Sequence, residues 1–220
     1  MLRFIHRFFM NNKYYNHYKF EDIEKDPNFD TSGFTYLKNF KAYLQEKDNT
    51  CAPCCALMIL NYYNDFRYNE EEIAVIMKTK PCPIGTDFID IINFFSNACD
   101  EKHKYQCFSN LDLKTNDNGK YFSTFDDFKA FLLENLKQGY PIILENVDYG
   151  GHYKVLIGYD EVNDNYEEDM LIFADPSDLN DGLKDGYSYF PADRFYFMWF
   201  DDHCLSKEYR TQPFIVVKKL

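Results

Sequence analysis

The spacing of hydrophobic positions is helical up to Gly139 and changes to that of short strands after it. Before Gly139, apolar residues recur every three or four positions, which is the spacing of one helix face. After Gly139, short apolar runs are separated by turn residues, which is typical of strands. Helices followed by strands predict an α+β fold, with helices packed on an antiparallel sheet.

Four helices are expected in the first part of the chain. Residues 51–63 are mostly apolar, and the apolar residues of this segment cover every face, which predicts a helix that runs through the core. Asn69 followed by three glutamates is typical of a helix start. Thr86 is expected to cap the next helix. Thr124 with Asp127 resembles a capping box, and the glycine at the end of that helix is expected to stop it.

Strands and domain limits follow from the same pattern. We expect strands over 105–108, 140–144, 150–160, 170–175 and 214–217. The sequence shows no internal repeat and no linker that would separate two domains. We therefore expect one α+β domain over residues 35–220, preceded by an arm over 1–34 that can form an amphipathic helix on the domain.

Composition excludes some partners. The 220 residues carry 24 Lys and Arg against 36 Asp and Glu, a net charge of -12. Binding to nucleic acid needs clustered basic residues, so nucleic acid is not an expected partner. The chain has no run of about 18 apolar residues, so no transmembrane helix is expected.

The number of cysteines indicates the redox state of the thiols and the cellular compartment. The chain has seven cysteines, an odd number, and its first residues lack the apolar region of a secretory signal. We therefore expect reduced thiols and a cytoplasmic location. An odd, unpaired set also leaves room for one reactive thiol.

Cys51 is the candidate for that reactive thiol. It lies where a polar loop enters the apolar helix, and Pro53 suits the first turn of a helix. Asn49 or Thr50 is expected to accept hydrogen bonds from the free N–H groups of the helix. The positive end of the helix dipole lowers the pKa of a thiol and favours the nucleophilic thiolate.

Three further residues complete a candidate catalytic set. His152 heads a strand after two glycines, and Asp175 ends the following strand. If these strands are adjacent and antiparallel, Asp175 can hold one imidazole nitrogen while the other faces Cys51 and takes its proton. Gln45 lies six residues before Cys51, and its amide and the Cys51 backbone N–H are expected to stabilise an oxyanion.

The ordered set resembles a known family. Its motifs are Gln45, Cys51-Ala52-Pro53, the helix end Leu60-Asn61-Tyr62-Tyr63, Gly151-His152-Tyr153, Gly158-Tyr159-Asp160 and Ala174-Asp175-Pro176. They resemble the papain-like cysteine peptidases, and most closely the soluble relatives of the bacteriocin-leader, or double-glycine, peptidases. The resemblance spans roughly residues 40 to 217. It implies a papain-like fold, a Cys51–His152–Asp175 triad with Gln45 as oxyanion donor, and hydrolysis of amide bonds in a peptide or protein without a cofactor.

One position departs from the family pattern. The family usually has glycine after the cysteine, whereas this chain has Ala52, whose methyl group can crowd the oxyanion hole or the substrate backbone. A catalytically silent papain-like domain that binds a peptide or protein partner is therefore an alternative. Transfer of the acyl group to an acceptor other than water, by an acyltransferase on the same fold, is another.

Two other uses of the cysteines are weaker. A metal site would combine Cys54 and Cys55 with Cys82 or His103. Structural zinc sites use two separated ligand pairs, and no second pair is visible, so we expect no metal. Small apolar residues inside a helix are the better interpretation of Cys54 and Cys55.

A nucleophile–base pair formed by His203 and Cys204 is the remaining alternative. Neighbours in the chain rarely have the geometry for proton transfer, and no orienting acid is evident beyond the two preceding aspartates. This pair is therefore not the expected site.

Overall fold

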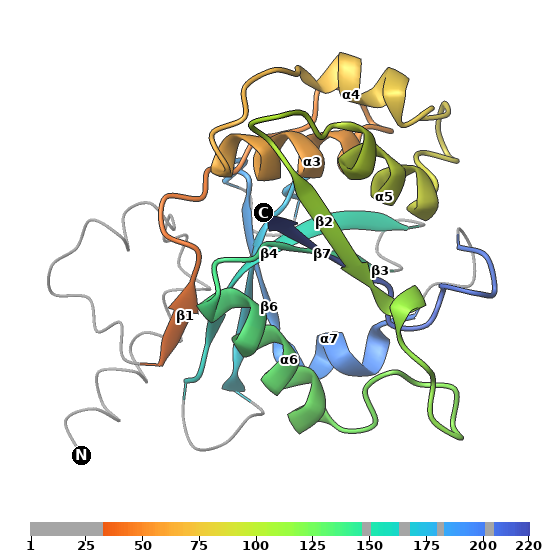
Figure 1. Ribbon diagram of the computed structural model, residues 1–220. Helices are drawn as coiled ribbons and strands as arrows, with labels where there is room; N and C mark the ends of the chain where they lie inside the picture. The colour runs from red at the N-terminus through yellow and green to blue at the C-terminus, as the bar shows by residue number, and fades with distance from the viewer. Residues whose placement is uncertain (1–32, 147–150, 163–167, 180–182, 201–204) are drawn as a thin grey trace, which may run out of the picture.

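The computed structural model describes residues 33–146, 151–162, 168–179, 183–200 and 205–220 (Figure 1). Two expectations fall outside these ranges and stay predictions: the helix of the N-terminal arm and the first glycine before His152. The His203–Cys204 pair, which is not the expected site, also lies outside them.

An antiparallel sheet forms the centre of the described part of the chain (Figure 1). Its strands are β1 Phe34–Tyr36, β2 Tyr105–Ser109, β3 Ile142–Asn146, β4 His152–Asp160, β5 Met170–Ala174, β6 Tyr187–Pro191 and β7 Phe214–Lys219. The order across the sheet is β2-β7-β3-β4-β5-β6. All five strands expected from the sequence are present, with ends shifted by one or two residues.

Strand β4 is the centre of this sheet, and all nine of its residues are buried. Strand β3 pairs with its first half and β1 with its second half, while β5 pairs along the other side. Gly158 lies between these neighbours, and a Cβ atom there would come within 3.1 Å of both Ile172 and Tyr36. Glycine is thus required where three strands approach closely.

Helices cover both faces of the sheet (Figure 1). They are α3 Cys51–Tyr62, α4 Glu70–Ile76, α5 Phe88–Asn97, α6 Phe125–Lys137 and α7 Ala192–Met198. The first three gather on one side of the sheet and the last two on the other. The expected α+β fold is confirmed; helix α7, in an aromatic-rich segment, was not predicted.

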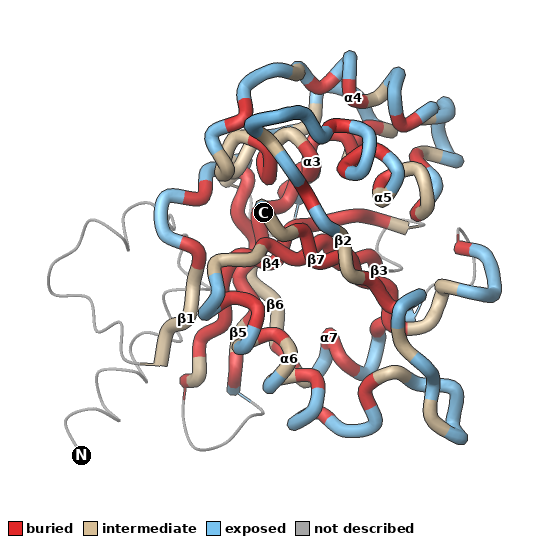
Figure 2. Tube along the Cα trace, viewed as in Figure 1, coloured by how far each residue is buried: buried red, intermediate tan, exposed pale blue. Residues whose placement is uncertain are grey.

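Helix α3 is a core helix, as its apolar pattern predicts. Eight of its twelve residues are buried, and it packs against the first residues of β4 (Figure 2). The thiol of Cys55 donates to the backbone carbonyl of Tyr153 at 3.3 Å, and the thiol of Cys54 donates to that of Tyr43 at 3.4 Å. The first contact ties the start of α3 to the start of β4, and the second ties it to the loop that precedes the helix.

Of the caps expected at α4, α5 and α6, two are confirmed and one is wrong. Capping boxes open α4 at Asn69 and α6 at Thr124. Asp87, rather than Thr86, caps α5, and its carboxylate accepts the backbone N–H of Ile89 at 3.0 Å. The hydroxyl of Thr86 instead bonds that of Thr79 at 2.8 Å, so it is not available to the helix.

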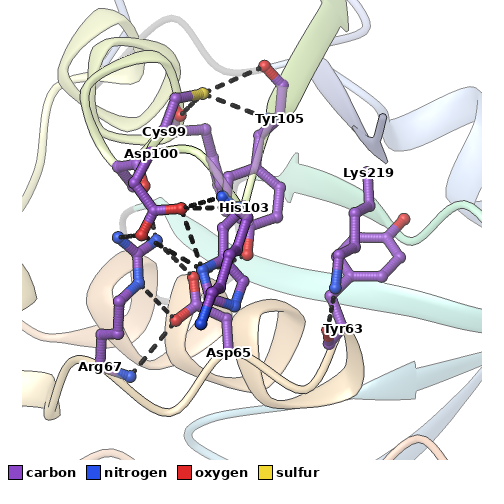
Figure 3. A network of polar contacts seen from close by, with 11 residues as sticks. Tyr63, Asp65, Arg67, Cys99, Asp100, His103, Tyr105 and Lys219 are labelled. Atoms are coloured by element: carbon purple, nitrogen blue, oxygen red, sulfur yellow. Dashed lines mark hydrogen bonds and ion pairs between the residues drawn. The ribbon is translucent and has the colours of Figure 1, made fainter.

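A polar network fixes the ends of α3 and α5 to β2, away from the candidate catalytic residues (Figure 3). The guanidinium of Arg67 donates to both carboxylate oxygens of Asp65 and to Asp100 at 2.7 to 2.8 Å. The hydroxyl of Tyr105 also donates to Asp65, at 2.7 Å. His103 lies 3.2 Å from Asp100 in the same network. These charged groups are paired, so the network is structural.

Candidate active site

The start of α3 leaves its positive end open at Cys51. Thr50 is the N-cap residue, but its hydroxyl donates to the carbonyl of Lys47 at 2.8 Å, and the amide of Asn49 donates to the carbonyl of Lys80. The expected side-chain cap is therefore wrong. Because the first turn carries no acidic side chain either, the free N–H groups of the helix keep their positive potential beside the thiol.

The structure brings His152 and Asp175 together. His152 begins β4 and Asp175 follows β5, and the two strands are adjacent and antiparallel, as the sequence argument required. Nε2 of His152 lies 2.7 Å from Oδ1 of Asp175. Both side chains are buried, so this contact is shielded from water and its charges interact strongly.

Cys51 and His152 change each other's pKa. Burial of the Cys51 thiol raises its pKa, but the hydrogen bond to His152 and the charge of that ring outweigh burial, and the pKa is lowered overall. Burial lowers the pKa of His152, whereas its bonds to Asp175 and Cys51 raise it, to about 9. The two directions agree with a thiolate beside an imidazolium.

Asp175 is held from several sides. Oδ1 also accepts the backbone N–H groups of Ser177 and Asp178, at 3.1 and 3.2 Å. Oδ2 accepts the hydroxyl of Ser188 at 2.9 Å and lies 3.2 Å from Nζ of Lys154. Burial raises the pKa of Asp175, but the bond to His152 and the charge of Lys154 hold it far below its usual value. Asp175 is thus ionised and fixed in place.

Sequence reasoning missed Lys154 and Ser188. Lys154 had a detectable signal, because it lies two positions after His152 in one strand and so shares a face of the sheet with it. A lysine in a mostly apolar strand needs a partner on that face. Ser188 had no such signal, because its contact depends on the pairing of β5 with β6.

Gln45 joins the loop before α3 to the segment after β5. Its backbone N–H donates to the carbonyl of Pro176 at 2.9 Å, and its side-chain Oε1 accepts the hydroxyl of Ser177 at 3.2 Å. Its Nε2 donates to the carbonyl of Lys47 at 2.8 Å. An amide nitrogen has two hydrogens, so one donor remains beyond this bond.

Cys51 lines a cavity of about 210 Å³. The loop 80–87 forms one wall, and Gly151 and Tyr153 at the start of β4 form another. Acidic residues from three parts of the chain also line it: Asp48, Asp87 and Glu145. A nucleophile on the wall of a cavity is open to a substrate carbonyl.

Ala52 faces away from this cavity. Its exposed fraction is 0%, it belongs to the hydrophobic core, and it is not part of the cavity wall. The methyl group therefore packs into the hydrophobic core on the inner side of α3 and does not narrow the space in front of Cys51. The sequence-based concern about crowding is not supported by this position of the side chain.

For a Cys51 that cleaves peptides, Ala52→Gly is accordingly expected to leave kcat/KM for that cleavage within about threefold of the parent. Glycine costs about 1 kcal/mol in a helix, so the free energy of unfolding should fall by about that amount. Urea unfolding and steady-state kinetics measure the two quantities. A rise of tenfold or more in kcat/KM would show that the methyl group does restrict the site.

The metal alternative finds no support in the described ranges. The thiols of Cys54 and Cys55 donate to backbone carbonyls, and His103 is paired with Asp100 in the network of Figure 3. No group of three His, Cys, Asp or Glu side chains that could hold a metal occurs among the described residues.

None of the helices in the described part of the chain has the length and apolar character needed to cross a membrane.

Comparisons with known proteins identify the family. Residues 37–199 match the family described as Peptidase_C39 like family. The fold is similar to the peptidase domain of Streptococcus ComA, a bi-functional ABC transporter involved in a quorum sensing pathway, at 17% identity and a TM-score of 0.53. That match covers 83% of this chain and 100% of the other.

A putative C39-like peptidase from Bacillus anthracis is similar at 14% identity, with a TM-score of 0.50, covering 84% of this chain and 98% of the other. No curated protein sequence gives a significant match. The structural matches share the papain-like cysteine peptidase fold, and the family match covers most of the chain. The chain therefore belongs to the peptidase C39-like family.

Proposed function

We propose that this protein is a cysteine peptidase or amide hydrolase that acts through a Cys51–His152–Asp175 triad. The observation that carries the proposal is the buried 2.7 Å contact between His152 and Asp175, beside Cys51 at the start of α3, where the same ring lowers the pKa of the thiol. A nucleophile, a base and a residue that orients the base are the three parts that this chemistry needs.

The proposed reaction has two steps. The Cys51 thiolate attacks the substrate carbonyl, and the tetrahedral oxyanion is stabilised by the Cys51 backbone N–H and the Gln45 amide. His152 then gives its proton to the leaving amine, and a thioester remains on Cys51. A water molecule, deprotonated by His152, attacks the thioester and releases the acid. Asp175 orients the ring in both steps.

The proposed substrate is a peptide or protein. Membership of a peptidase-like family and a nucleophile on the wall of an accessible cavity support this class. We place the catalytic domain at residues 35–220 and the N-terminal arm at 1–34. A cytoplasmic location is part of the proposal, supported by six cysteines that are free in the described part of the chain.

A peptide-library digest of the full chain tests the proposal. The parent is expected to cleave a subset of peptides, and Cys51→Ala to cleave none. Products with one added water indicate hydrolysis, and products joined to an added amine indicate acyl transfer. If neither protein produces cleaved or transferred products, or if both produce the same ones, the proposed function is wrong.

Gln45→Ala tests the oxyanion assignment separately. The loss of one oxyanion donor is expected to lower kcat by about 10²- to 10³-fold with a small change in KM, because the donor acts on the transition state. Gln138→Ala, at the end of α6 and remote from Cys51, is the matched control and should keep the parent kinetics. Equal kcat values for the two variants would remove Gln45 from the mechanism.

A further inference from the structure

Lys154 is a buried charge that reaches the triad from the same strand as His152. Its exposed fraction is 3%, and its Nζ lies 3.2 Å from Oδ2 of Asp175. His152 takes the other oxygen of the same carboxylate, at 2.7 Å. One carboxylate thus bridges two cationic groups. The imidazole gains and loses a proton during the proposed reaction, whereas the ammonium group is not a reactant.

The charges of these four groups balance in the resting enzyme and in the thioester of the proposed reaction. In the resting pair, the Cys51 thiolate and the His152 imidazolium cancel, and so do Asp175 and Lys154. In the thioester, the sulfur and the imidazole are both neutral, and Asp175 and Lys154 still cancel. Without the lysine, a buried carboxylate would then face an uncharged ring, which is a costly arrangement in a protein interior.

The position of Lys154 is fixed by its surroundings. Its ammonium group lies over the ring of Phe173, 5.8 Å from the ring centre, and the hydroxyl of Ser188 donates to the same carboxylate oxygen. Within the described residues, the groups that face the His152–Asp175 pair are Cys51 and Cys55 on α3, Lys154 on β4 and Ser188 on β6. Lys154 is the one permanent cation among them.

We propose that Lys154 is a positioning residue for the triad: it neutralises Asp175 throughout the reaction and holds one carboxylate oxygen, so that the other faces His152. This inference rests on the proposed function, because the changes in charge belong to that mechanism. The positive charge also opposes the imidazolium, so Lys154 limits how basic His152 becomes.

Lys154→Met should therefore make His152 more basic. The alkaline limb of the kcat/KM profile, and the imidazole shift measured by NMR on histidine-labelled full chain, are expected to move up by about one pH unit. Lys154→Arg should restore the parent value, because it restores the charge. Lys129→Met is the matched control, since Lys129 is also ion-paired with a buried aspartate, Asp169 at 2.8 Å, but outside the site.

Each outcome decides the matter. A shift in Lys154→Met that is absent in Lys154→Arg and Lys129→Met supports the inference, whereas a loss of stability or rate without a shift shows a structural role alone and overturns it. If Lys154→Met does not fold, the double variant Asp175→Asn, Lys154→Met should fold, because no buried carboxylate remains to be neutralised; an unfolded double variant contradicts the proposal. If the His152 titration measured by NMR shifts in Lys154→Met but the parent cleaves no peptide, the electrostatic role of Lys154 is supported and the proposed function is refuted.

Discussion

Replacing His152 by alanine is expected to lower kcat/KM for peptide cleavage by about 10²- to 10⁴-fold, the usual contribution of a general acid–base group. The same ring lowers the pKa of Cys51, so the variant loses both the proton carrier and the stabilised thiolate. Steady-state kinetics on a peptide found in the library digest measure the effect.

The control for this variant is His103→Ala. His103 is also bonded to an aspartate, Asp100, but in the network of Figure 3. Its removal is expected to change kcat/KM by less than about threefold, because it contacts no part of the site. Comparable losses in the two histidine variants would mean that unfolding, and not chemistry, explains the result.

Replacing Asp175 by alanine is expected to lower the free energy of unfolding by about 3 to 5 kcal/mol, the cost of breaking a buried ion pair by removing one partner. The substitution leaves Lys154 without this counter-ion, and it also removes the acceptor of the Ser188 hydroxyl. Urea unfolding at neutral pH measures the loss. Asp126→Ala, an exposed aspartate in the first turn of α6, should cost about 1 kcal/mol or less.

The loss in Asp175→Ala should depend on pH with a definite sign. The pKa of Asp175 is lower in the folded chain than in the unfolded chain, so its contribution is complete above the ordinary pKa of an aspartate, about 4. It disappears as the pH falls further, towards the lowered folded-state pKa. The difference between parent and variant should therefore narrow below about pH 4; a constant difference would show that the ionised carboxylate is not what stabilises the fold.

The best-predicted positions are those that follow from the local spacing of hydrophobic residues. The apolar helix at Cys51 and the strand that starts at His152 follow from hydrophobic spacing alone. The strands of His152 and Asp175 follow one another in the chain, and such neighbours commonly pair in antiparallel sheets. For the same reason, the contact between His152 and Asp175 was accessible from the sequence.

What the sequence did not reveal depends on contacts between distant segments. Thr50 was expected to cap α3, but Lys47 competes for its hydroxyl, and loop geometry decides between them. The Ala52 side chain lies in the core and not in the cavity because of which side of α3 faces the core. A sequence that is apolar on every face of the helix does not indicate which side this is. Ser188 reaches Asp175 only through the register of two strands.

The most direct test of the proposed thiolate–imidazolium pair is the rate at which iodoacetamide alkylates Cys51 as a function of pH, read by mass spectrometry in the parent and in His152→Ala. The parent is expected to react selectively at Cys51, and at pH values well below the ordinary pKa of a thiol. In His152→Ala, reaction at Cys51 should slow at neutral pH and rise only through the ordinary thiol range. Slow labelling of all thiols alike, unchanged by the removal of His152, would contradict the account.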